Sequence, residues 1–142
     1  MSSLAIFQGV QALLPVQARS HLFEAELSDP PRLSDFPYVV IHGGWGDEVS
    51  GEPGDRSSCD IPDQAAMQVL CTMVATSREG LNAIVGQVRT ALNRQRPVVA
   101  GWRFSRMIQR QVTTVEPDQR ISIETISPLY VVDEFTFTAF RA

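Results

Sequence analysis

One segment of the chain gathers most of the residue types that could carry out chemistry. Residues 42–63 read HGGWGDEVSGEPGDRSSCDIPD and contain five of the nine glycines, one of the two histidines and one of the two cysteines. Glycine clusters invite comparison with phosphate-binding loops, and the histidine, thiol and carboxylates invite comparison with metal or nucleophile sites. The segment therefore decides which classes of enzyme the sequence can support.

The glycine clusters do not have the pattern of a nucleotide site. A P-loop requires a lysine, and the chain contains none. A dinucleotide fingerprint runs from a strand directly into a helix, where the helix N-terminus receives the pyrophosphate. Here the glycines lead from one expected strand, residues 37–43, to another, residues 65–76. We predict no nucleotide-binding site.

The remaining side chains of the segment give no catalytic pattern. The possible metal ligands are His42, Asp47, Glu48, Cys59 and Asp60. None of them has the short CxxC or HxxxH spacing that closes a zinc site, although loop carboxylates can hold a divalent ion weakly across a subunit boundary. A nucleophilic cysteine would require a histidine base and an orienting acid, and neither histidine lies in such a motif. We predict no catalytic residue, no cofactor and no metal centre, and so no enzyme.

Two adjacent acids lie in the closing segment LYVVDEFTFTAFR. Side chains alternate between the two faces of a strand, so Asp133 and Glu134 cannot form a facing carboxylate pair. The same alternation places Leu129, Val131 and Phe135 on one face. We expect one of the two acids to be exposed and the other to be paired with an arginine.

Three arginines are spaced along GWRFSRMIQRQV. If this segment is one strand, Arg106 and Arg110 share a face with Trp102 and Phe104, and Arg103 faces the other way. Arginines interleaved with aromatic residues are one signature of single-stranded nucleic-acid binding. Because the formal net charge of the chain is −4, we favour protein contacts or intramolecular ion pairs.

Composition indicates one ordinary globular domain spanning residues 1–142. The chain is 44% hydrophobic and 20% charged, and no apolar run approaches the roughly 18 residues that a membrane span requires. The N-terminal sequence lacks the basic region and cleavage site of a secretory signal. We therefore expect a protein that stays in the cytoplasm in which it is made and does not contact a membrane.

Periodicity predicts an α+β fold. Residues 2–14 place Leu4, Phe7, Val10 and Leu14 on one helical stripe, and residues 76–94 form a second, clearer helix that Thr76 or Ser77 can cap. Alternation in AAMQVLCTMVAT places Cys71 on a buried strand face. Residues 21–27 fit either a helical turn or a short strand, whereas 101–115, RISIETI and LYVVDEFTFTAFR are strand-like. We predict a mostly antiparallel sheet of two hairpins with the helices packed on one face.

The connection between the first two strands is unusually long. Residues 43–62, which we call the arm, exceed the roughly 12–15 residues typical of structureless connections in compact domains. We predict a flexible β-hairpin arm that orders on contact with a partner.

The order of these elements resembles the tail terminator (tail completion) proteins of long-tailed, siphovirus-type bacteriophages. The resemblance rests on PYVVIHG, the polar arm, the strand and helix ending in ATSREGLNAIVGQVRTAL, then GWRFSRM and the closing YVVDEFTFTAF. It implies a structural virion protein in the tail or neck, assembled in the host cytoplasm. In that family a ring, usually a hexamer, caps the tail tube, ends its polymerisation and presents a surface to the head-completion protein of the neck. Genomic DNA passes through the lumen without sequence-specific binding.

The candidate contact residues come from their chemistry and not from a family motif. Buried tryptophan and arginine dominate interface energies, so Trp45 is the first choice within the arm. We predict that subunit or tail-tube contacts involve Trp45, Asp47, Glu48, Arg56, Asp60, Arg103, Arg106 and Arg110. Two alternatives stay open: another neck or head-closure protein, and a small enzyme or ligand-binding domain with residues 43–62 as a lid.

Overall fold

A computed structural model describes residues 3–43, 47–48, 64–120, 122–123 and 125–142. These residues form an α+β fold with a mostly antiparallel sheet, as predicted. The helical elements are α1 (Ser3–Gln11), α2 (Arg78–Leu92) and the short 3₁₀ turns η1 (Val16–Ala18) and η2 (Leu33–Asp35). The strands are β1 (Ser20–Leu22), β2 (Tyr38–Gly43), β3 (Asp47–Glu48), β4 (Gln64–Ala75), β5 (Trp102–Phe104), β6 (Ile108–Gln111), β7 (Glu116–Pro117) and β8 (Leu129–Arg141).

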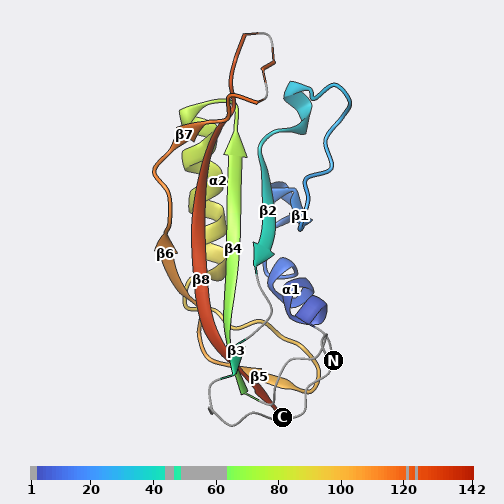
Figure 1. The fold of residues 1–142 in the computed structure, drawn as a ribbon, viewed down its shortest axis with the longest axis vertical. Helices are drawn as coiled ribbons and strands as arrows, with labels where there is room; N and C mark the ends of the chain where they lie inside the picture. Colours follow the sequence, from blue (N-terminus) through green and yellow to red (C-terminus); the bar gives the residue numbers. More distant parts are fainter. Residues whose placement is uncertain (1–2, 44–46, 49–63, 121, 124) are drawn as a thin grey trace.

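Two long strands form the centre of the sheet (Figure 1). β4 and β8 are antiparallel and pair along their whole common length, from Gln64 opposite Phe140 to Ala75 opposite Leu129. The order across the sheet is β1-β2-β4-β8-β5, with β3 beside β4 and with β6 and β7 beside β8. Only the β1–β2 pair is parallel among the described strands. The β2–β4 hairpin is confirmed, and the second expected hairpin is realised as three short strands along β8.

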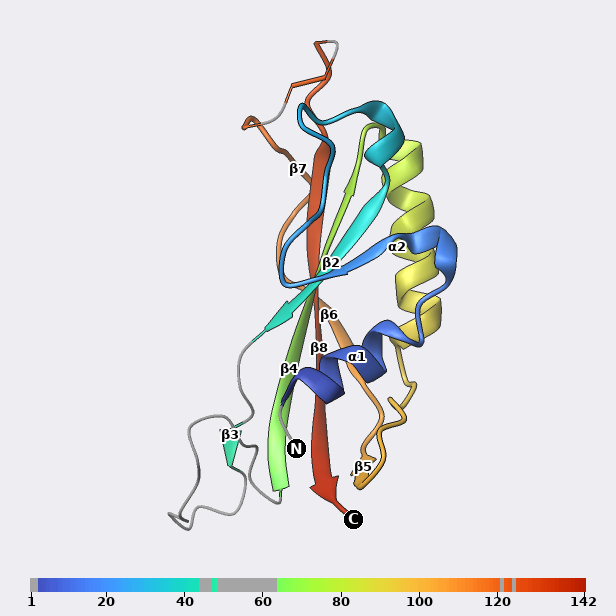
Figure 2. The same ribbon diagram turned by 90° about the vertical axis from the view of Figure 1, so that its right-hand side faces the viewer.

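Both helices cover the same face of the sheet, which Figure 2 shows edge-on. The alternation in β4 buries Met67, Val69, Cys71 and Met73 against this helical layer, as expected. In β8 the same face buries Val131, Phe135 and Phe137. Burial of these side chains at about 25 cal/mol per Å² of apolar surface is the main force that holds the two layers together.

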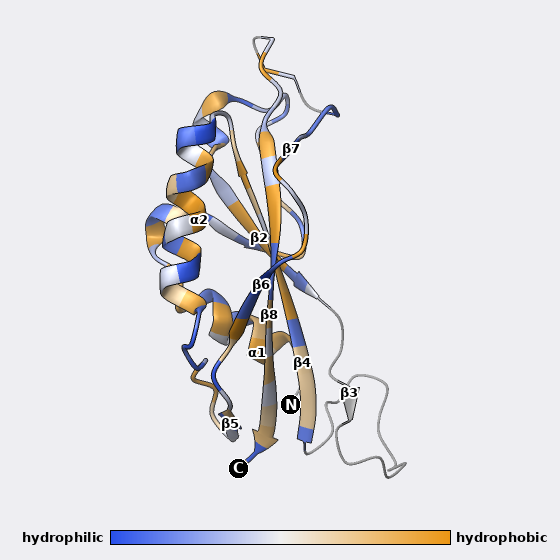
Figure 3. Cartoon of the chain, turned by 90° about the vertical axis from the view of Figure 1, so that its left-hand side faces the viewer, coloured by the Kyte–Doolittle hydropathy of each residue, from blue (hydrophilic) through white to orange (hydrophobic). Residues whose placement is uncertain are grey.

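Helix α2 follows the predicted stripe. Leu81, Ile84, Val88 and Leu92 are buried, and hydrophilic and hydrophobic residues alternate along the ribbon of the helix (Figure 3). Of the two possible caps, Ser77 is used, because its Oγ accepts a hydrogen bond from the Gly80 N–H at 3.0 Å. A serine cap of this kind typically stabilises a helix by about 1 kcal/mol.

Helix α1 differs from its predicted stripe at one position. Phe7 and Val10 are buried as expected, but Leu4 is 42% exposed and Ile6 is fully buried. The helix ends at Gln11, so Leu14 reaches the core from the following turn and not from the helix. The predicted stripe counted Leu14, which lies beyond the end of the helix. It therefore placed Leu4, and not Ile6, on the buried side of the first turn.

The segment 21–27, which fitted a helical turn or a short strand, takes part in the short strand β1 at Ser20–Leu22. Two other strand predictions need correction. The expected strand at 101–115 is divided into β5 and β6, because the pairing with β8 shifts by one residue between Phe104 and Ile108 and Met107 turns into the core. In RISIETI the described residues form only an isolated bridge between Ile123 and Ile126.

The described residues cover the face opposite the helices at one end only. There Phe36, Tyr38, Val74 and Ile123 form a second, small cluster. Along the middle of this face, the residues at alternate positions are exposed or half-buried, except for the buried Glu134. We call this surface the open face; it consists of His42, Gln68, Leu70, Thr72, Val132, Glu134 and Thr136.

Candidate subunit interface

The two acidic arm residues that the structure describes lie at one edge of the sheet. Asp47 and Glu48 form β3 and pair with Ala66 and Ala65 of β4. Part of the predicted arm is therefore an edge strand. Its pairing with β4 is shifted by one residue relative to the pairing of β2 with β4. The other predicted arm contacts, Trp45, Arg56 and Asp60, lie outside the described residues, as does Cys59.

The predicted arginines lie at the opposite edge. Arg103 is exposed in β5, and Arg106 is exposed at the break between β5 and β6. The expectation that Arg106 and Arg110 share a face with Trp102 and Phe104 is wrong, because Met107 takes the buried position that follows them and Arg110 pairs with Glu134 on the opposite face. Arg103 keeps the predicted orientation, since its two neighbours in the strand are buried and it is not.

The pairing register places these two edges at the same end of the sheet. Glu48 pairs with Ala65, Ala65 with Ala139, and Ala139 with Phe104, so Glu48 and Phe104 lie at the same level across the sheet. Asp47 lies level with the residue that follows Phe104. Three strand spacings of roughly 4.8 Å separate β3 from β5, so the edges lie about 14 Å apart. The structure thus places Asp47 and Glu48 on one side of this end and Arg103 on the other.

The third predicted arginine takes part in a network on the open face. Arg110 Nη2 lies 3.3 Å from Glu134 Oε1, and Gln68 Nε2 donates to Glu134 Oε2. The Arg110 side chain is 70% exposed, whereas that of Glu134 is 11% exposed. Arg110 therefore keeps most of its guanidinium at the surface while it neutralises a buried carboxylate.

Asp133 is paired on the helical face. Its carboxylate accepts hydrogen bonds from Arg89 Nε at 2.7 Å and Arg89 Nη2 at 2.9 Å, and the side chain has no exposed surface. This contact raises the pKa of Arg89. The expectation that one of the two adjacent acids is exposed is wrong: they do point to opposite faces, but Asp133 and Glu134 are both buried and both paired with arginine.

The buried thiol and the open-face histidine are held in neutral forms. Cys71 is completely buried opposite Asp133, and burial first and the Asp133 charge second raise the pKa of its thiol. Burial lowers the pKa of His42, whose Nε2 lies 2.9 Å from Thr72 Oγ1. A neutral thiol is a poor nucleophile and metal ligand, so Cys71 functions as a core residue.

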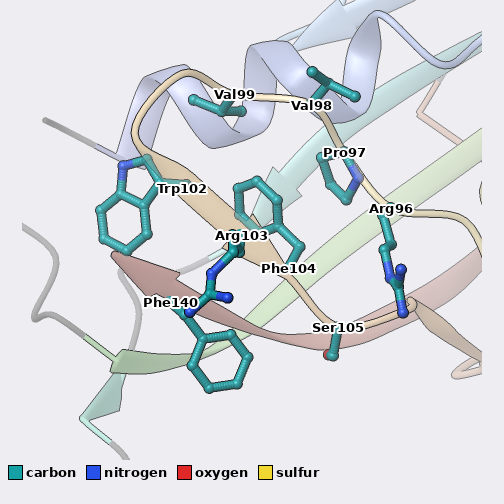
Figure 4. Close-up of a pocket in the computed structure, with 9 residues that line it drawn as sticks. All are labelled: Arg96, Pro97, Val98, Val99, Trp102, Arg103, Phe104, Ser105 and Phe140. Carbon is teal, nitrogen blue, oxygen red and sulfur yellow. The ribbon is translucent and has the colours of Figure 1, made fainter. Parts of the chain in front are cut away.

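A largely apolar cavity of about 700 Å³ opens beside β5 (Figure 4). Its walls come from the loop at 96–99, from β5 and from Phe140 of β8, with Arg96 and Arg103 as its charged members. The loop packs closely on α1, since a Cβ on Gly9 would lie 2.7 Å from Val99 Cγ2. At the side of this cavity, the Arg141 guanidinium lies 4.9 Å from the centre of the Trp102 ring. Arg103 therefore borders a surface that apolar and acidic groups can both contact.

Two of these residues had not been predicted, namely Arg89 and Arg96. A signal for Arg89 was present in the sequence, because Asp133 occupies an odd position of β8 between the buried Val131 and Phe135. A carboxylate there requires a buried cationic partner, and α2 is the element packed on that face. Arg96 follows the helix in a loop, and no periodicity indicated where it would lie.

The chain matches no protein-family model, and no curated protein matches it either. In the part of the chain that the structure describes, no helix is long and apolar enough to cross a membrane. Nor do the described residues bring three or more histidine, cysteine or acidic side chains together as a metal site.

Proposed function

We propose that this protein is a structural, ring-forming tail terminator of a long-tailed bacteriophage. In this role it caps the tail tube, ends its polymerisation and provides the surface that joins the tail to the head-completion protein. The proposal combines the order of elements in the sequence with the α+β architecture, in which a helical layer covers one face of a mostly antiparallel sheet.

One observation carries the ring itself: two oppositely charged edges lie at the same end of the sheet. β3 contributes Asp47 and Glu48 at one edge, and β5 with the following turn contributes Arg103 and Arg106 at the other. Rings of identical subunits use two different, complementary surfaces on each subunit. Opposite charges at matching positions bring such surfaces together in the correct register and disfavour contacts between like edges.

In this proposal the arm strengthens the contact after the edges meet. Its tryptophan, Trp45, lies between β2 and β3 in sequence, and its remaining acids and Arg56 lie between β3 and β4. Genomic DNA would pass through a ring whose subunits each carry a formal charge of −4, so that repulsion limits adhesion to the lumen.

The experiment that tests the proposal is assembly on tail tubes. Purified protein is mixed with tail tubes and imaged by negative stain, with light scattering of the protein alone as the measure of subunit number. Ring-shaped particles at tube ends and arrested tube growth are the expected result. A compact monomer that leaves tube growth unchanged overturns the proposal, and rings that bind the head connector but not the tube favour a head-closure protein instead.

A further inference from the structure

Two exposed apolar surfaces lie at one level on opposite edges of the sheet. Phe23 follows β1 directly and is 47% exposed. On the other edge, Ile108 of β6 is 57% exposed and Val112, just after β6, is 47% exposed. The pairing register connects these places through the row Leu22–Ile41–Cys71–Asp133–Gln111.

Both surfaces also border the open face. Ile108 pairs with Thr136 and Arg110 pairs with Glu134, and residues paired across an antiparallel ladder point to the same side of the sheet. At the other edge, Phe23 lines a hollow of about 470 Å³ together with His42 and Thr72. The Phe23 ring also packs edge-on against Phe7 of α1, with 5.3 Å between the ring centres, so it spans the edge of the sheet and borders the open face from there.

Charge distinguishes the two edges. Glu24 and Glu26 follow Phe23 and are both exposed, and among the described residues neither takes part in an ion pair. Arg110 lies between Ile108 and Val112 with 70% of its side chain exposed, although one nitrogen contacts Glu134. One edge thus combines an aromatic ring with acids, and the other combines two aliphatic side chains with a guanidinium.

We propose that these edges bind each other between neighbouring copies of the chain. Phe23 of one copy packs on Ile108 and Val112 of the next, and Glu24 lies opposite Arg110. The contact is head-to-tail because its two surfaces differ. Their common level along the strands favours a closed ring over a rising filament. This inference rests on the proposed function and adds a second contact to the β3–β5 charges.

Charge exchange between two variants tests the contact. Variant one carries Glu24→Arg and Glu26→Arg; variant two carries Ile108→Glu and Val112→Glu. Each variant alone sets like charges against each other, and we expect its self-association to weaken on the order of 100-fold. In an equimolar mixture, the altered acidic edge meets the altered apolar edge, and the two unchanged edges meet as in the wild type. Sedimentation velocity is expected to show that the mixture regains the wild-type assembly.

Matched substitutions elsewhere control for the change in charge. Glu79→Arg lies on the exposed start of α2, and Val16→Glu lies at a position 93% exposed in the turn η1. Both are expected to assemble as the wild type does, and circular dichroism checks the folding of every variant. If folded variants one and two each form wild-type rings, or if their mixture stays dissociated, the contact is overturned while the proposed function stands. A wild-type chain that is monomeric alone and on tail tubes overturns both.

Discussion

Replacing Arg89 with methionine should destabilise the fold more than any other loss of a single ion pair among the described residues. The change keeps most of the aliphatic stem but leaves Asp133, which has no exposed surface, without its two charge-assisted hydrogen bonds. Removing one partner of a buried pair typically costs about 3–5 kcal/mol. Because the Arg89 side chain is 35% exposed, water already weakens the pair, and we expect a loss of about 3 kcal/mol.

Urea unfolding followed by tryptophan fluorescence measures this loss. With a slope of about 2 kcal/mol per molar urea, the midpoint should fall by about 1.5 M. The double variant Arg89→Met with Asp133→Leu should recover most of the stability, because removing both partners leaves no buried charge. Arg110→Met is the matched control, with an expected loss of about 1 kcal/mol, since Gln68 still donates to Glu134. A midpoint shift below about 0.3 M, or a double variant as unstable as the single one, would refute the reasoning.

Three further outcomes are expected. Because the folded-state pKa of His42 is lowered, its contribution to stability is present above pH 6.5, its usual pKa, and is lost as pH falls through the folded-state value. His42→Gln should therefore lose less stability than the wild type between pH 7.5 and 5 in urea titrations, and equal losses would contradict this. In a Cys59→Ser variant, Cys71 is the remaining thiol, and its burial and raised pKa should prevent labelling by a disulfide reagent at pH 8 until urea is added. Rapid labelling of the folded variant would contradict this expectation. Trp45→Ala should fold normally but fail to cap, giving overlong tails when tail length is measured by electron microscopy; tails of normal length would exclude a role for Trp45 in capping.

The elements predicted correctly are those in which one period dominates. β4 alternates over twelve residues, β8 over thirteen, and α2 carries a four-residue apolar stripe, so burial of one face determines each of them. The prediction for 101–115 was wrong because Met107 interrupts the alternation after Phe104, and a core position, not a local propensity, decides where the ladder breaks. Ile123 was placed in a strand by its composition, yet it packs in the small cluster with Phe36, Tyr38 and Val74.

The candidate interface was predictable in residue type but not in position. Arg103 was correctly expected to face away from Trp102 and Phe104, because a three-residue alternation is local. Asp47 and Glu48 lie at the level of Phe104 because of the registers of β3, β5 and β8. These registers are set by pairings between distant parts of the chain, which the local sequence does not reveal. The same is true of the level shared by Phe23 and Ile108.

The position of β8 in the sheet has a consequence for how the protein is made. β4 depends on β8 for one of its two long edges, and β5, β6 and β7 all pair with β8 as well. The ribosome completes β4 at residue 75 and β8 at residue 141, so at about 5–20 residues per second β4 waits roughly 3–13 s for its partner. During this interval the nascent chain presents a twelve-residue unpaired strand edge, with Met67, Val69 and Met73 not yet enclosed. Successful production therefore depends on keeping nascent chains apart until translation of β8 is complete.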